Sequence, residues 1–202
     1  MRELRFDRRF LWVLAVGIAA VDLLVILYGL IFGFHHMRRE NGLLEVAQLV
    51  ALAVAGVGFG ALIPRLRHGG RIVASGAAVM CVMFFFREFE TPLHNPLLDF
   101  MSSDPFLWIL AAVFGLFLAI QIYLNWAHVP AFLGWLVRFQ WWPWLFGGSL
   151  LLIGSAFEAM HLAFMEELFE LNGDVVFALI AVTALGRSLR AANAHVPALH
   201  AH

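Results

Sequence analysis

Residues 157–174 read FEAMHLAFMEELFELNGD and follow an apolar segment that starts at Trp144. Four glutamates and one histidine lie in this short stretch of a chain that is otherwise poor in charge. If the stretch continues the apolar segment as one helix, Glu158 and His161 share a face, because residues three apart are neighbours on a helix. Glu167 then points to the opposite side. A carboxylate and an imidazole at this spacing are typical of metal sites in helical bundles.

The composition of the 202-residue chain indicates an integral membrane protein. Hydrophobic residues make up 62% and charged residues 13%, and the mean hydropathy is +0.86. A soluble domain is about half apolar and about a quarter charged. The single cysteine, Cys81, excludes a disulfide framework and a cysteine-rich metal site. We find no G-x-S-x-G, G-x-G-x-x-G or Walker A motif, and nothing indicates a nucleic-acid partner.

Six hydrophobic segments are long enough to cross a hydrocarbon layer of about 30 Å. We expect them at residues 10–34, 43–63, 72–86, 106–126, 144–165 and 175–189. The first is predicted to be a retained helix rather than a signal peptide, because its apolar run continues well past Asp22. The fold prediction is therefore an all-α polytopic membrane bundle. It forms one domain over residues 1–190, followed by a disordered cytoplasmic tail at 191–202.

The distribution of arginines predicts that both chain ends lie in the cytoplasm and that the protein is in the cell inner membrane. Ten arginines fall on the side of the N-terminus and three on the other, as the positive-inside rule requires. The inner set is Arg2, Arg5, Arg8, Arg9, Arg65, Arg67, Arg71, Arg138, Arg187 and Arg190, and the outer set is Arg38, Arg39 and Arg87.

Acidic residues and histidines gather at the opposite, outer end, where three spans carry them at a similar depth. They are Glu45 on the second span, Glu88, Glu90 and His94 after the third, and Glu158, His161 and Glu166 on the fifth. A charged group costs about 2.5–3.5 kcal/mol at the centre of a membrane helix, and less near the interface. We therefore expect these groups to face one another around one cavity.

The predicted site has catalytic and metal-binding parts. Glu45, Glu88, Glu158 and His161 are the candidate catalytic residues, and Glu158, His161 and Glu45 are the candidate ligands of zinc, iron or manganese. Alternatives remain open for the charged residues nearby. Glu166, Glu167 and Glu170 also suit a solvated rim, and Arg87 with Glu88 and Glu90 also suits an interfacial ion-pair cluster.

Asp22 and the small residues suggest how the spans pack. Asp22 lies within the first span, where it suits either a packing contact with a neighbouring helix or a proton relay. Small residues at 51–60, 75–78 and 147–156 predict close approach of the second, third and fifth spans.

Three short motifs resemble a group of uncharacterised bacterial multi-pass membrane proteins. They are ENGLLEVAQ at residues 40–48, the Arg87-Glu88 pair, and the EE-x-x-E run at 166–170. This resemblance covers about a fifth of the chain and implies no known activity. A looser similarity, to the membrane hydrolase superfamily that contains alkaline ceramidases, gives Glu45 and His161 the roles of metal-site residues. The late His-x-x-x-His of that superfamily is absent here, and six spans are expected rather than seven.

Three functions fit these observations. The first is a metal-dependent membrane hydrolase or oxidoreductase acting on a lipid-like substrate in the outer leaflet. The second is a proton- or cation-coupled transporter in which Asp22 connects the outer acidic site with the cytoplasm. The third is a subunit of a membrane complex, whose polar clusters bind a partner. The sequence favours them in this order.

Overall fold

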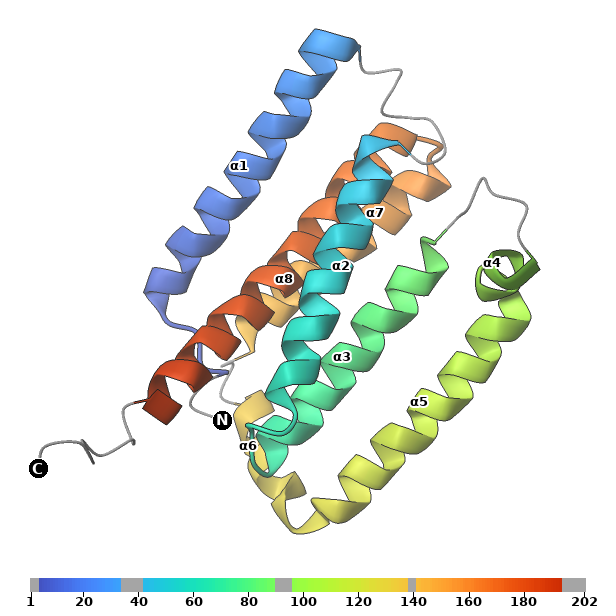
Figure 1. The fold of residues 1–202 in the computed structure, drawn as a ribbon. Helices are drawn as coiled ribbons and strands as arrows, with labels where there is room; N and C mark the ends of the chain where they lie inside the picture. The colour runs from blue at the N-terminus through green and yellow to red at the C-terminus, as the bar shows by residue number, and fades with distance from the viewer. Residues whose placement is uncertain (1–3, 34–41, 90–95, 138–140, 194–202) are drawn as a thin grey trace, which may run out of the picture.

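The computed structural model describes residues 4–33, 42–89, 96–137 and 141–193, and every regular element in these ranges is helical (Figure 1). The elements are α1 (Arg8–Phe32), α2 (Leu43–Leu62), α3 (Gly69–Arg87), α4 (Pro96–Met101), α5 (Asp104–Leu124), the 3-10 helix η2 (Trp126–His128), α6 (Val129–Val137), α7 (Trp142–Ala159) and α8 (Ala163–Asn193).

Five helices, α1, α2, α3, α5 and α8, are long and apolar enough to cross a membrane. The structure thus confirms an all-helical architecture, and these five helices indicate a multi-pass membrane-embedded protein. The remaining long helix, α7, has 18 residues and packs along α8.

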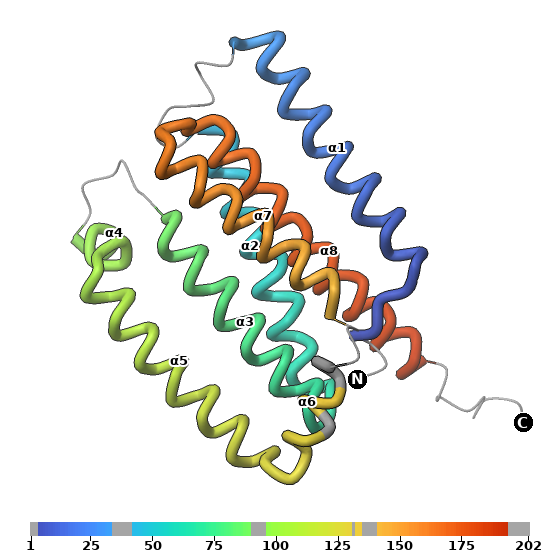
Figure 2. The backbone as a smooth tube through the Cα atoms, turned by 180° about the vertical axis from the view of Figure 1, so that it is seen from behind, coloured from blue at the N-terminus to red at the C-terminus, as the bar shows by residue number. Residues whose placement is uncertain are grey.

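Helix α8 is the centre of the bundle. It packs against α2, α7 and α1, while α2 also packs against α3, and α3 carries α5 on its outer side. Figure 2 shows α1 and α5 at opposite edges of the bundle. The main core contains Phe59 of α2 together with Val176 and Ile180 of α8, all fully buried. We call the two ends of the bundle the α6 end, where both described chain termini lie, and the α4 end.

The link between α7 and α8 is the main difference from the expected spans. Helix α7 ends at Ala159, and His161 adopts a left-handed conformation with φ 58°. The amides of His161 and Leu162 then donate hydrogen bonds to the carbonyls of Glu158 (2.9 Å) and Phe157 (3.0 Å), which is the pattern of a Schellman helix end. The chain reverses here, within the span predicted at 144–165.

Helix α8 consequently begins earlier than the span predicted at 175–189. The connection that the predicted spans leave at residues 166–174 is wrong, because these residues, including Asn172 and Gly173, belong to α8. Asn172 and Gly173 are both buried. The helix also continues to Asn193, into the region predicted as a disordered tail, and residues 194–202 of that tail lie outside the described residues. The third span, expected at 72–86, is slightly longer and starts at Gly69.

Glycines bring the backbones of α2, α7 and α8 close together. A Cβ at Gly58 of α2 would lie 2.9 Å from the Cβ of Ala181 on α8. On α7, a Cβ at Gly147 would lie 3.1 Å from Val176, and one at Gly154 would lie 2.7 Å from Cγ of Glu170. The predicted approach of the second and third spans is present as the α2–α3 contact, where Gly56 faces Cys81 and Val82. The small residues of α2 and α7 also serve contacts with α8, which the prediction had left out.

We predict that a methyl group at Gly173 destabilises the bundle. In Gly173→Ala the new Cβ would lie 2.7 Å from Leu151 Cδ2 and 3.2 Å from the Gly147 carbonyl oxygen, so the Leu151 side chain must shift and the α7 backbone must give way slightly. Overpacking of this kind costs about 1–3 kcal/mol. The measurement is thermal unfolding of purified protein in detergent.

Gly186→Ala is the matched control on the same helix, because a Cβ there meets no atom within 4 Å. It should be neutral or slightly stabilising, since alanine is a better helix former than glycine by about 1 kcal/mol. Equal melting temperatures for the two variants would contradict the close α7–α8 packing.

Candidate functional site

Two buried carboxylates on α8 form the centre of the candidate site. Glu170 and Asp174 are four residues apart and therefore lie on the same face of the helix. Their exposed fractions are 8% and 4%. Neither makes a hydrogen bond or an ion pair with another described residue. Gly154 of α7 makes room for the Glu170 side chain, because a Cβ there would overlap Cγ of the glutamate.

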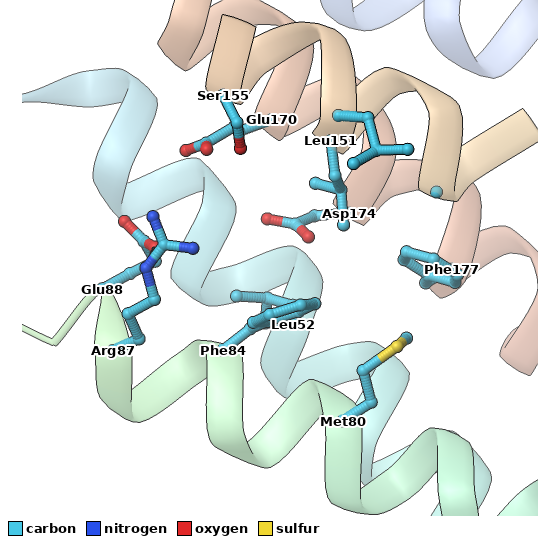
Figure 3. Close-up of a pocket in the computed structure, with 12 residues that line it drawn as sticks. Leu52, Met80, Phe84, Arg87, Glu88, Leu151, Ser155, Glu170, Asp174 and Phe177 are labelled. Carbon is cyan, nitrogen blue, oxygen red and sulfur yellow. Dashed lines mark ion pairs between the residues drawn. The ribbon is translucent and has the colours of Figure 1, made fainter. Parts of the chain in front are cut away.

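Both carboxylates line a cavity of about 310 Å³ between α2, α3, α7 and α8 (Figure 3). Arg87 and Glu88, at the α4 end of α3, line the same cavity from the opposite side. The remaining lining is mostly apolar and includes Phe84 of α3. A small polar group entering this cavity would therefore meet carboxylates in an otherwise apolar environment.

The cavity lining carries more acidic than basic groups. Arg87 Nε lies 3.4 Å from Glu88 Oε1, so the one guanidinium in the lining already has a carboxylate beside it. Glu170 and Asp174 remain without a positively charged partner at ion-pair distance among the described residues. Such a site favours a ligand that is positively charged or that donates hydrogen bonds.

Glu167 faces α2 rather than solvent. The side chain of Gln48, fully buried on α2, donates hydrogen bonds from Nε2 to the Glu167 carbonyl oxygen (3.2 Å) and to Glu167 Oε2 (3.1 Å). Together with the burial of Glu170, this shows that the solvated rim expected for Glu166, Glu167 and Glu170 is wrong for two of the three residues. Glu166 is half-buried in the first turn of α8.

Asp22 makes a packing contact on a third side of α8. Its Oδ1 accepts a hydrogen bond of 2.9 Å from Nδ2 of Asn172, which joins α1 to α8. Asn172 lies two residues from both Glu170 and Asp174, so it projects from the far side of the helix. Of the two roles considered for Asp22, the structure supports the packing contact with a neighbouring helix.

The structure does not bring the predicted site residues together around the cavity. Glu88 lines it, but Glu158 is exposed in the last turn of α7 and His161 is exposed in the turn that follows. The helical face expected to join Glu158 and His161 does not exist, because the helix ends between them. Glu45 is half-buried in the first turn of α2 and is not part of the lining. Glu90 and His94 lie outside the described residues.

The sequence interpretation missed Asp174 and placed Glu170 at the surface. The error came from placing residues 166–174 between two spans, which put the acidic residues at a helix exit. The Glu170-x-x-x-Asp174 spacing was the available signal. It places two carboxylates on one face of any helix that runs through them.

No metal centre and no relative of known function supports a more specific assignment. Within the described ranges, no group of three or more His, Cys, Asp or Glu side chains is arranged to hold a metal ion. Comparison of the chain with protein-family models, with curated proteins and with solved structures returns no match. The two resemblances drawn from sequence motifs, to uncharacterised bacterial membrane proteins and to the alkaline ceramidase superfamily, stay predictions.

We predict that Asp22 and Asn172 are energetically coupled. In a double-mutant cycle of Asp22→Ala and Asn172→Ala, the loss in the double variant should be smaller than the sum of the single losses. The coupling should be about 0.5–1.5 kcal/mol, the range for interhelical hydrogen bonds in membranes. The measurement is the free energy of unfolding in bicelles or detergent.

A cycle of Asp22→Ala with Gln48→Ala is the control, because Gln48 bonds to Glu167 and not to Asp22. Those two changes should be additive to within about 0.5 kcal/mol. Additivity in the Asp22–Asn172 cycle as well would show that the α1–α8 hydrogen bond does not contribute to stability.

Proposed function

We propose that this protein is a multi-pass membrane protein that binds a lipid-like amphiphile through a positively charged head group. The observation that carries the proposal is the pair of unpartnered, buried carboxylates, Glu170 and Asp174, in a cavity of about 310 Å³. Burying an uncompensated charge is costly, so a cation that enters the cavity gains two partners that the protein itself does not satisfy.

The alternatives drawn from the sequence receive less support from this geometry. The metal-dependent hydrolase or oxidoreductase needs Glu45, Glu158 and His161 as one ligand set, and these residues do not form a group in the structure. The coupled transporter needs Asp22 in contact with the acidic site, but Asp22 bonds to Asn172 on another side of α8. Binding of a lipid-like ligand is the part of the enzyme prediction that the cavity supports.

The proposal adds α7 to the five long apolar helices, which makes six spans. It also includes an orientation with both chain ends in the cytoplasm. Arginines of the described residues support it, because those at the α6 end outnumber those at the α4 end. The α6 end has Arg5, Arg8, Arg9, Arg65, Arg67, Arg71, Arg187 and Arg190, and the α4 end has Arg87. In this orientation the carboxylate cavity opens in the outer half of the inner membrane.

We predict that the turn at His161 is accessible from outside the cell. In a Cys81→Ala background, cysteines at Ser102 and His161 should react with a membrane-impermeant maleimide in sealed cells. A cysteine at His68, at the α6 end, should react only after the cells are opened. Reaction at His68 in sealed cells would overturn the orientation, and protection at His161 would contradict α7 as a span.

We predict that the cavity binds quaternary ammonium ions. Radiolabelled tetramethylammonium should bind the wild-type protein saturably in uncharged maltoside micelles, measured by equilibrium dialysis. Glu170→Gln or Asp174→Asn should weaken binding by about ten-fold or more, because loss of one buried charge partner costs about 2–5 kcal/mol. Binding should also weaken as pH falls, since the ligand keeps its charge and only the carboxylates take up protons.

Asp99→Asn is the matched control. It removes the same charge from an exposed residue of α4, near the same end of the bundle, and should leave the affinity within about two-fold. Equal affinities of wild type, Glu170→Gln and Asp174→Asn would rule out head-group binding at these carboxylates.

A further inference from the structure

A second, apolar cavity continues the first along the bundle toward the α6 end. It has a volume of about 500 Å³ and lies between α3, α5, α6 and α7, with Phe177 of α8 also in its lining. Met80, Gly148 and Phe177 line both cavities, so the two meet at these residues.

The register of the lining residues shows that the two cavities form one track. On α3, residues 72–80 line the apolar cavity and residues 80–88 line the carboxylate cavity. On α7, which runs parallel to α3 in this topology, the corresponding residues are 141–148 and 148–155. The apolar part follows α3 for about 12 Å, at 1.5 Å per residue.

The track exists because α3 and α7, which line it from opposite sides, do not pack closely on each other. Helix α3 packs on α2 and α5, and α7 packs on α8. Gly76 of α3 and Gly148 of α7 both line the apolar cavity, and a Cβ added at either one would meet no atom within 4 Å. Two glycines thus keep open a space that larger side chains would fill.

We propose that this apolar cavity holds the hydrocarbon chain of the amphiphile, which reaches it laterally from the bilayer. The proposal rests on the proposed function, because the head group at Glu170 and Asp174 is what places the chain in the track. The side chains of Trp141 and Trp144, at the start of α7, line its end toward α6. The ligand is thus a cationic amphiphile with one hydrocarbon chain in the apolar cavity, either its only chain or one chain of a larger lipid.

The apolar cavity selects ligands by fit rather than by hydrophobic attraction. A chain that leaves the bilayer exchanges lipid neighbours for equally apolar side chains, so the transfer itself gains little free energy. Blocking the cavity must therefore exclude long-chain ligands sterically, while a head group without a chain should still bind. The different response of these two kinds of ligand distinguishes the chain site, which is the apolar cavity, from the head-group site at Glu170 and Asp174.

The test is a substitution series at Gly76, which lines the apolar cavity but not the carboxylate cavity. Gly76→Ala, Gly76→Leu and Gly76→Phe should progressively weaken binding of tetradecyltrimethylammonium, with a loss of about ten-fold or more for phenylalanine. Tetramethylammonium affinity should change by less than about two-fold. Both are measured by equilibrium dialysis in maltoside micelles, on protein whose helical circular dichroism matches the wild type.

Gly115→Phe is the control, because Gly115 lies on the exposed side of α5, lines neither cavity, and a Cβ added there would meet no atom within 4 Å. It should bind both ligands like wild type. Unchanged tetradecyltrimethylammonium affinity in Gly76→Leu and Gly76→Phe overturns the chain site and leaves the head-group site intact. Failure of tetramethylammonium to bind the wild type overturns the head-group site, and the chain site with it.

Discussion

Close packing of α8 against α2 and α7 is the constraint on which the rest of the structure depends. Hydrocarbon chains solvate apolar helices as well as other helices do, so the bundle needs contacts that lipid cannot offer. Glycines at 58, 147, 154 and 173 supply them by letting backbones approach within the reach of a single Cβ. The same close approach encloses polar groups of α8 that could not face lipid.

Helix α8 distributes its polar residues among different neighbours. Asn172 bonds to Asp22 of α1, and Glu167 bonds to Gln48 of α2. These two contacts pair polar groups across helices and so tie α1 and α2 to α8, although Gln48 Oε1 and Asn172 Oδ1 are buried without a hydrogen-bond partner. Glu170 and Asp174 differ, because they face a cavity and have no such partner among the described residues. This difference in surroundings is the observation behind the binding role that we propose for Glu170 and Asp174.

The sequence predicted the class of fold better than the site. Length and hydropathy of each apolar run are local properties, so the positions of α1, α2, α3 and α5 follow from them closely. The α7–α8 boundary does not, because the reversal depends on His161 adopting a left-handed conformation that no glycine or proline marks. One misplaced turn moved Glu170 and Asp174 from the middle of a helix to its exit.

The rest of the site could not be predicted because helix rotation is set by packing partners that hydropathy does not identify. Glu45, Glu158 and His161 were predicted to share one depth, but depth leaves the facing direction of each group open. Glu88 does line a cavity from the end of α3, but none of these three residues lines it with Glu88. The groups that cost most to bury are therefore a better indicator of the site than the predicted depth of a residue in the membrane. Two carboxylates four residues apart in an apolar helix lie on one face and share one environment, and here that environment is a cavity between α2, α3, α7 and α8.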